Sequence, residues 1–140
     1  MTGSAKHLDV GRRGEFIAAA YLEQNGCRIL HRNYRNAHRE IDLIYTDGES
    51  LAFCEVKTRC CSSLDLSDMT YGRPARAVDR QKQKNLTLAA RAYLHEHPVD
   101  GLRLRFDVIE VYLRRGTTGT APSDILKTHH IRNAFPASYR

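Results

Sequence analysis

Two short apolar segments separated by a turn constrain the fold of this chain more than any other feature. The first, Glu40–Tyr45, has the sequence E-I-D-L-I-Y, and the second, Leu51–Lys57, has the sequence L-A-F-C-E-V-K. Between them lies T-D-G-E-S, a composition typical of a β-hairpin turn. The sequence therefore predicts an antiparallel hairpin of two interior strands that nevertheless contain charged residues.

Periodic patterns predict the remaining elements. Apolar residues recur at three- and four-residue steps in two segments, which we expect to be helices at about 12–25 and 78–97. The residues that make these repeats are Phe16, Ala19, Ala20 and Glu23 in the first helix, and Leu86, Ala89, Ala90, Tyr93 and Leu94 in the second. Alternating patterns predict strands at 27–34 and 102–113, and a weaker pattern predicts an edge strand at 125–131.

The resulting order is α-β-β-β-α-β with a candidate fifth edge strand, which is an α/β fold of the α+β, mixed-sheet kind. A length of 140 residues fits one domain, 1–140, with its core at about 11–113, a flexible loop at about 114–123 and a C-terminal strand and tail at 124–140. No apolar run approaches the roughly 18 residues that cross a bilayer, and the N-terminal segment lacks a signal-peptide pattern. We therefore expect a cytoplasmic protein without a membrane partner.

The four cysteines, Cys27, Cys54, Cys60 and Cys61, have neither a disulfide framework nor the spacing of a zinc site. We expect reduced thiols, with Cys54 as a small core residue. The histidines also lack ligand spacing, and His129 and His130 are expected to be exposed.

The chain is basic, with 22 Lys and Arg against 16 Asp and Glu and a formal charge of +6. Such a balance favours a polyanionic partner, of which nucleic acid is the commonest. A basic surface that serves only solubility explains the charge equally well, so the choice depends on a site.

The hairpin supplies a candidate site. Two registers are open, with either Gly48-Glu49 or Asp47-Gly48 as the two turn residues. The two registers differ by an even number of residues, so they place the same side chains on the same face of the hairpin. Because side chains alternate along a strand, either register directs Glu40, Asp42, Glu55 and Lys57 to one face. Like charges so close together are unfavourable without compensation, which a divalent cation such as Mg²⁺ or Mn²⁺ would provide.

In this interpretation Asp42 and Glu55 bind the cation, with Glu40 as a third acidic ligand, while Lys57 orients the nucleophile and stabilises charge on a phosphate. The alternative is a polar sheet face on which Glu40 and Lys57 form a surface ion pair, and for any one of these residues alone it is the better explanation.

The pattern of Asp42, twelve residues and then Glu55-Val56-Lys57 resembles the signature of the PD-(D/E)XK nuclease superfamily, which includes restriction enzymes and archaeal Holliday-junction resolvases. The chain is also identified as a member of the bacterial YraN family, a nuclease-like group without assigned substrates. The matching segments are G-R-R-G-E-F-I-A-A-A-Y-L at 11–22, E-I-D-L-I at 40–44, E-V-K-T-R at 55–59, R-F-D-V at 105–108 and I-R-N-A-F at 131–135.

The resemblance implies a restriction-endonuclease-like core with Asp42, Glu55 and Lys57 as its centre, joined by Glu15 on the first helix. A first-turn carboxylate that interacts with the helix dipole is an equally good interpretation of Glu15. The chain departs from the superfamily in having Ile41 in place of the proline before the aspartate, and from the family in having Arg39 in place of a glycine.

Basic and amide residues are candidates for phosphate contacts, which position a nucleic acid without recognising its sequence. The candidates are Arg12, Arg13, Arg59, Arg73, Arg76, Lys82 and Gln83. For Lys82 and Gln83, which match a basic-amide pair of the family, a solvated helix face is the preferred alternative.

These observations favour a Mg²⁺- or Mn²⁺-dependent endonuclease acting on DNA, branched or structured DNA included. A nucleic-acid-binding module that keeps the fold but does not cut is the second hypothesis, and a protein-interaction adaptor is the third. By analogy with resolvases, a homodimer is a reasonable expectation.

Overall fold

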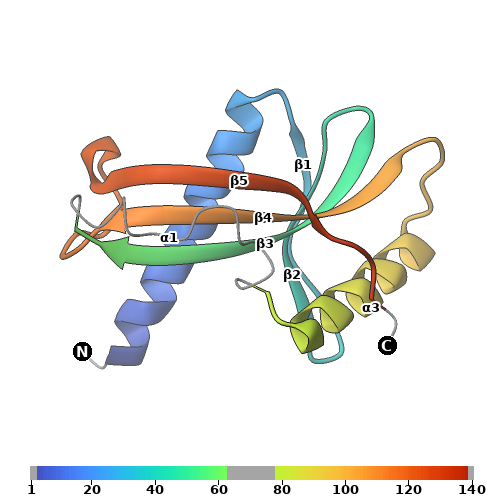
Figure 1. Ribbon diagram of the computed structural model, residues 1–140, viewed down its shortest axis with the longest axis horizontal. Helices are drawn as coiled ribbons and strands as arrows, with labels where there is room; N and C mark the ends of the chain where they lie inside the picture. Colours follow the sequence, from blue (N-terminus) through green and yellow to red (C-terminus); the bar gives the residue numbers. More distant parts are fainter. Residues whose placement is uncertain (1–2, 63–77, 139–140) are drawn as a thin grey trace.

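The computed structural model describes residues 3–62 and 78–138. Its elements are α1 (Gly3–Gln24), β1 (Arg28–Asn36), β2 (Arg39–Thr46), β3 (Ser50–Cys61), α3 (Arg80–Glu96), β4 (Arg103–Arg114), a 3-10 turn η2 (Pro122–Asp124) and β5 (Ile125–Phe135). The five strands form one mixed sheet in the order β1-β2-β3-β4-β5, in which only β3 and β4 are parallel (Figure 1).

The predicted order of elements is confirmed, and the candidate fifth strand is present as β5. The lengths differ from the prediction. The first helix begins at Gly3 rather than near residue 12, β3 continues to Cys61, and β5 continues to Phe135. Pairing between neighbouring strands extends β3 and β5 beyond the segments in which the local alternation is clear.

The two long helices cover opposite faces of the sheet. On one face, Ile17, Ala18 and Leu22 of α1 pack in a buried cluster that includes Leu43 and Ile109 of the sheet. On the other face, the predicted apolar stripe of α3 is confirmed, since Leu86, Ala89, Ala90 and Tyr93 are buried against strand residues. The core therefore has two layers, one on each side of the sheet.

The buried face of α1 matches the predicted one only in part, since Ala19 is buried as expected. Phe16 was expected in the apolar repeat, but it is 60% exposed, whereas its neighbours Ile17 and Ala18 are buried. Apolar residues occur on more than one side of this helix, so the periodicity did not specify which side meets the sheet.

A close crossing of α1 over β3 explains a glycine near the middle of the helix. A Cβ atom at Gly14 would lie 1.8 Å from Thr58 Oγ1, so no larger residue fits there without a shift. For Gly11, one turn earlier, no atom of the described residues lies within 4 Å of the same position. Gly14 therefore sets how closely α1 approaches β3.

The register of the β2–β3 hairpin is one of the two predicted. Thr46 pairs with Leu51 and Leu43 with Cys54, which makes Gly48 and Glu49 the turn residues. The Asp47 side chain stabilises the turn by accepting hydrogen bonds from the backbone N–H groups of Glu49 and Ser50 at 2.9 and 2.8 Å.

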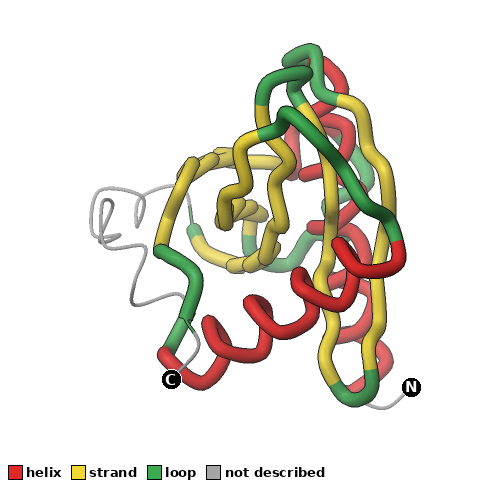
Figure 2. Tube along the Cα trace, turned by 90° about the vertical axis from the view of Figure 1, so that its right-hand side faces the viewer, coloured by secondary structure: helices red, strands yellow, loops and turns green. Residues whose placement is uncertain are grey.

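The strands β2 and β3 are paired only between these residues and then diverge. Beyond Leu43, β2 stays paired with β1 to the hairpin tip, whereas β3 runs beside β4 as far as Cys61. In Figure 2 the β1–β2 hairpin extends away from the β3–β4–β5 strands, which are seen nearly end-on. Asp42 and Glu55 are the first residues past the last paired positions.

A buried polar network at β4 corrects the expectation for His130. Its side chain is only 4% exposed, and Nε2 lies 2.8 Å from Asp107 Oδ2 and 2.9 Å from the Tyr45 hydroxyl. The Tyr45 hydroxyl also donates to Asp107, and the N–H of Asn133 donates to Asp107 Oδ1 at 3.0 Å. Because this carboxylate has no exposure and several donors, His130 and Tyr45 are drawn into the interior.

The four cysteines are free, and Cys54 is buried, as predicted for a core residue. Among the described residues, neither long helix contains an apolar stretch of the length that would span a membrane.

Candidate active site

The point where β2 and β3 diverge places a carboxylate between the strands. Asp42 Oδ2 accepts a hydrogen bond of 2.8 Å from the backbone N–H of Val56, so the side chain replaces a backbone acceptor beyond the last paired residues. Burial, and then the neighbouring charge of Glu55, raise the pKa of Asp42 well above its usual range. A carboxylate in this position is unfavourable unless a cation approaches it.

Glu55 is 5% exposed and lies between two ammonium groups. Its Oε1 atom is 3.6 Å from Lys57 Nζ and 3.6 Å from Lys82 Nζ, while its Oε2 atom is buried without a hydrogen-bond partner among the described residues. Buried carboxylate oxygens are nearly always hydrogen-bonded, and exceptions call for an explanation such as an ion. One oxygen of Glu55 is thus compensated and the other is available.

A second pair of carboxylates lies on the α1 side. The Asn33 amide nitrogen, in the orientation that satisfies both contacts, is 2.9 Å from Glu15 Oε1 and 2.9 Å from Glu40 Oε1. Glu15 is half-buried, and its pKa is raised first by burial and then by Glu40, with Glu55 contributing further. Glu40 also forms an ion pair with Arg35 at 3.2 Å.

The expectation that four charged residues share one regular face is therefore only partly right. Asp42, Glu55 and Lys57 converge, but Glu40 lies with Glu15 instead. The alternation of β2 breaks at Asp42, because Ile41 is buried in the α3-side cluster whereas Leu43 is buried in the α1-side cluster.

The backbone of β1 shows a matching irregularity. Asn33 lies opposite Asp42 in the register and has a φ of +52°, a conformation that asparagine tolerates better than most residues. This kink turns the hairpin arm and brings the amide to the two carboxylates. Sequence reasoning did not identify Asn33, since nothing in H-R-N-Y marks a left-handed residue inside a strand.

The predicted phosphate-contact residues have different surroundings. Lys82 is brought to the centre by its contact with Glu55, whereas the Gln83 amide donates to the Val78 carbonyl at 2.9 Å and stabilises the start of α3. Arg59 Nε is 3.5 Å from Glu110 Oε2, a buried β4 carboxylate that sequence reasoning also missed.

On α1, Arg12 is exposed, and Arg13 has its guanidinium carbon 6.0 Å from the ring centroid of Phe16. Arg73 and Arg76 lie outside the described residues. The roles of all these residues in nucleic-acid binding stay predictions.

Asp42 and Glu55 fit a hard divalent cation. Within residues 3–62 and 78–138, no three His, Cys, Asp or Glu side chains form a ready-made metal cluster. Mg²⁺, however, is commonly bound through one or two carboxylates together with water and substrate phosphate. The unpartnered Oε2 of Glu55 and the raised pKa of Asp42 are the two features that such a cation would compensate.

Comparison with known proteins shows the family. The family model described as "Uncharacterised protein family UPF0102" matches residues 14–111, a range that includes Glu15, Asp42, Glu55, Lys57 and Lys82. A UPF0102 protein of Chlorobium phaeobacteroides strain BS1 is 42% identical over 91% of this chain and 94% of its own length.

Two further relatives are similar over nearly their whole length. A UPF0102 protein of Geobacter sulfurreducens is 39% identical over 98% of this chain and 96% of its own length, and one of Frankia casuarinae is 42% identical over 90% and 95%. The predicted membership in the YraN family, which is UPF0102, is thereby confirmed, whereas the resemblance to the PD-(D/E)XK nuclease superfamily stays a prediction. The chain belongs to the uncharacterised protein family UPF0102.

Proposed function

We propose that this protein is a divalent-metal-dependent endonuclease that hydrolyses phosphodiester bonds in DNA. The observation that supports this function is the carboxylate pair of half-buried Asp42 and buried Glu55, in which one Glu55 oxygen has no partner among the described residues and the other lies near two lysines. Phosphodiester hydrolysis requires that the negative charge developing on the phosphate is stabilised. A metal cation held by acidic residues, with ammonium groups beside it, provides that stabilisation.

Asp42 and Glu55 would hold Mg²⁺ or Mn²⁺, with Glu15 and Glu40 as additional acidic groups behind them. When bound, the cation supplies Lewis acidity at the phosphodiester. The resemblance of the D-x(12)-E-x-K pattern to Holliday-junction resolvases supports branched or structured DNA as the substrate.

The chain's own side chains have separate roles in this proposal. Lys57 is 35% exposed and Lys82 is 40% exposed, so both ammonium groups reach solvent beside Glu55 and can bind a phosphate oxygen. Glu15 has a raised pKa because of burial and the nearby carboxylates, which makes it a better proton acceptor from water than an exposed glutamate. Asn33 orients Glu15 for this task.

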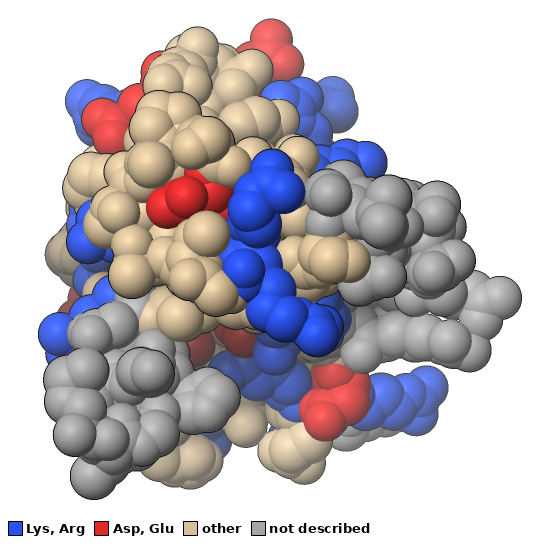
Figure 3. Space-filling model, turned by 90° about the vertical axis from the view of Figure 1, so that its left-hand side faces the viewer, with Lys and Arg blue, Asp and Glu red and all other residues tan. Residues whose placement is uncertain are grey.

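The surface charge also supports a nucleic-acid partner. Figure 3 shows Lys and Arg side chains gathered in a column on one end face of the molecule. This is the end at which β3 and β4 finish, and the exposed basic residues there include Arg59, Arg114 and Arg115. Arginines at the ends of the strands, on the same β3–β4 pair that contains Glu55, would position a DNA backbone by phosphate contacts.

The test is a cleavage assay with labelled duplex, single-stranded, flap and four-way-junction DNA in the presence of Mg²⁺, Mn²⁺ or a chelator. Asp42→Ala and Lys57→Ala are expected to lower the cleavage rate about a hundredfold or more, the usual loss when a charge-stabilising group is removed. Glu49→Ala, which removes an exposed turn carboxylate, serves as the matched control and should keep full activity. Cleavage that survives both site substitutions would exclude this centre as its source.

A second candidate is a nucleic-acid-binding module that does not cut DNA. The lack of a three-ligand cluster among the described residues favours it. Calorimetric titration with Mn²⁺ separates the two candidates, because an endonuclease of this kind should bind the cation with Asp42 and Glu55 and lose binding in Glu55→Gln. Salt-sensitive DNA affinity without any Mn²⁺ binding would support the binding module instead.

A further inference from the structure

The exposed side of α3 contains an unassigned row of basic residues. Arg80, Lys84, Arg91 and His95 are spaced by four, seven and four positions, which places them within an arc of about 60° on an α-helix. The row, which we name the α3 stripe, extends about 22 Å along the helix. In Figure 1, α3 lies at the outside of the molecule, at lower right.

The α3 stripe is not neutralised within the described residues. Several other basic side chains have acidic partners: Arg32 with Glu23, Arg35 with Glu40, Arg59 with Glu110, and Arg105 with Asp47 and Asp107. In the part of the chain that the structure describes, none of the four stripe side chains forms an ion pair. The helix itself contains a single acid, Glu96, which accepts a hydrogen bond from Tyr34. An uncompensated basic row is suited to bind a polyanion.

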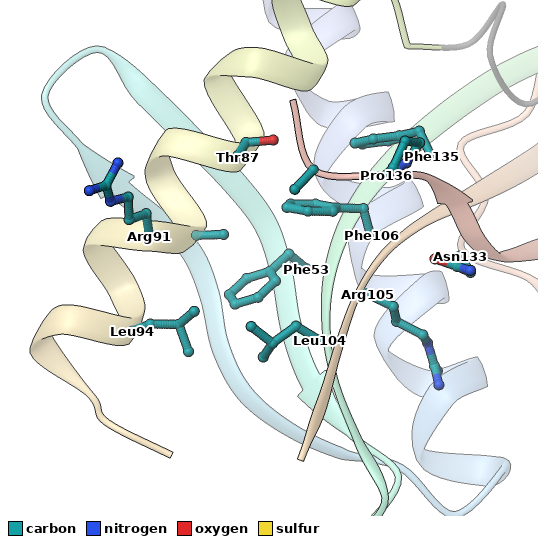
Figure 4. A pocket seen from close by; sticks show the side chains of 12 residues that line it. Phe53, Thr87, Arg91, Leu94, Leu104, Arg105, Phe106, Asn133, Phe135 and Pro136 are labelled. Atoms are coloured by element: carbon teal, nitrogen blue, oxygen red, sulfur yellow. The ribbon is translucent and has the colours of Figure 1, made fainter. Parts of the chain in front are cut away.

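An aromatic-lined cavity opens beside the α3 stripe. It has a volume of about 170 Å³ and lies between α3, β4 and the C-terminal segment after β5. Figure 4 shows Phe53 facing Leu94 of the helix across this space, with Leu104 beside Phe53, while the guanidinium of Arg91, a lining residue at the rim, is directed away from the phenylalanines. Leu104 is 51% exposed, which is unusual for so large an apolar side chain in a strand. A cavity of about 150 Å³ accommodates a six-membered aromatic ring, so this one is of the right size for the ring of a base.

The α3 stripe and the cavity meet at Arg91, which belongs to both. Proteins that bind single-stranded nucleic acid combine a basic track for the backbone with aromatic side chains against which bases pack. A duplex keeps its bases stacked and paired, so it could use the stripe but could not fill the cavity.

We infer that the α3 stripe and its adjoining cavity bind single-stranded nucleic acid, with phosphates along Arg80, Lys84 and Arg91 and one unstacked base in the cavity. Lys82, which contacts Glu55, lies in the first turn of α3 on the side opposite the stripe, so the Arg80 end of the stripe is the end nearest the proposed catalytic centre. The inference extends the proposed function by naming an unpaired segment as the substrate feature. Binding measurements alone test this inference. A protein that does not cleave DNA could therefore still confirm or contradict it.

The first test measures fluorescence anisotropy of a labelled oligothymidine and of a labelled duplex, with a chelator present. The single strand should bind at least about tenfold more tightly than the duplex at low salt. The double variant Lys84→Glu/Arg91→Glu should weaken single-strand binding by about tenfold or more. A loss of two phosphate contacts should also reduce the slope of log affinity against log salt by about 1.4.

The matched control is Arg28→Glu/Arg103→Glu, which likewise reverses two exposed positive charges, one on β1 and one at the start of β4, outside both the stripe and the cavity lining. This control should change single-strand affinity by less than about threefold. Both the control and the Lys84→Glu/Arg91→Glu variant should leave the unfolding temperature unchanged. Equal weakening by the control would mean that total charge and not the α3 stripe determines binding, and the inference would be overturned.

The second test addresses the cavity. An abasic oligonucleotide with the same phosphates should bind at least about fivefold more weakly than oligothymidine, since packing of a base is lost. The chain has no tryptophan, so Leu104→Trp places a single fluorescent reporter at the cavity. Its emission should change with oligothymidine and not with the abasic strand. The inference would be overturned if the abasic strand bound as tightly as oligothymidine, or if the duplex bound as tightly as oligothymidine. It would also be overturned if an acidic peptide bound to the site and neither nucleic acid did.

Discussion

The neighbouring carboxylates of Asp42 and Glu55 have different electrostatic surroundings. Asp42 is fixed by the N–H of Val56 and its charge is disfavoured, whereas Glu55 has two lysines at one oxygen. Because Asp42 has a raised pKa in the folded protein, the folded state binds more protons than the unfolded state between the ordinary and the raised value. The free energy of unfolding therefore falls as pH rises through that window.

Asp42→Asn is accordingly expected to raise the free energy of unfolding of the cation-free protein. The asparagine keeps an oxygen acceptor for Val56 but has no charge, so the gain should grow between about pH 5 and pH 8 and reach roughly 1–2 kcal/mol. Urea unfolding at both pH values measures it. Glu49→Gln, at an exposed turn position, should show no comparable gain, and a pH-independent difference for Asp42→Asn would contradict the assigned pKa direction.

At the scale of elements, the contact between α1 and β3 determines whether Glu15 can reach the strands. The helix approaches so closely that Gly14 faces Thr58 without space for a methyl group, while Gly11 has open space. Both glycines lie inside α1, where glycine by itself destabilises a helix. Of the two, Gly14 alone has a packing reason to be there among the contacts that the structure describes.

Substitution of the two glycines by alanine should therefore have opposite signs. Gly14→Ala is expected to lower the free energy of unfolding by about 3 kcal/mol because it forces α1 away from Thr58. Gly11→Ala should raise the free energy of unfolding by about 0.5–1 kcal/mol through helix propensity. Thermal and urea unfolding check both values. Thr58→Ala in the Gly14→Ala background should recover part of the lost stability, because it removes the side chain that the new methyl group meets. A stabilising effect of Gly14→Ala would contradict the close crossing of α1 over β3.

At the scale of the whole molecule, Asp107 connects strands that the chain order separates. From β4 it accepts hydrogen bonds from Tyr45 of β2 and from the backbone of Asn133 in β5, and it pairs with Arg105. Although burial alone would raise its pKa, these donors together with His130 hold the pKa of Asp107 below its ordinary value. The stabilisation is present above the unfolded-state pKa and is lost as pH falls through the folded-state value.

Asp107→Asn should lower the free energy of unfolding by about 3 kcal/mol at neutral pH, because Arg105 and the other donors lose their buried charge partner. The difference from the unsubstituted protein should shrink as pH falls toward the acid range, where Asp107 is protonated in both states. Urea unfolding as a function of pH measures this. Tyr45→Phe removes one donor and should cost about 1 kcal/mol, and a larger loss than in Asp107→Asn would contradict the central role of the carboxylate.

Much of the fold was predictable from local patterns. The alternation in Glu40–Tyr45 and Leu51–Lys57, with a turn of even length between them, reduced the register to two alternatives, and the structure has the one that places Asp42 across from Glu55. The strand at 125–131 was the weakest prediction, since its pattern is irregular, and pairing with β4 determines its full extent.

The sequence by itself determined the order of the elements, the hairpin register within two alternatives and the closeness of Asp42, Glu55 and Lys57, because strand alternation and turn length act over a few residues. Only the tertiary structure decided that Lys82 reaches Glu55, that Glu40 turns toward Glu15, that Phe16 is exposed and that His130 is buried. These outcomes depend on how α1, α3 and β5 pack on the sheet. Contacts between residues far apart in the chain leave no periodic signal, so no local pattern could have predicted them.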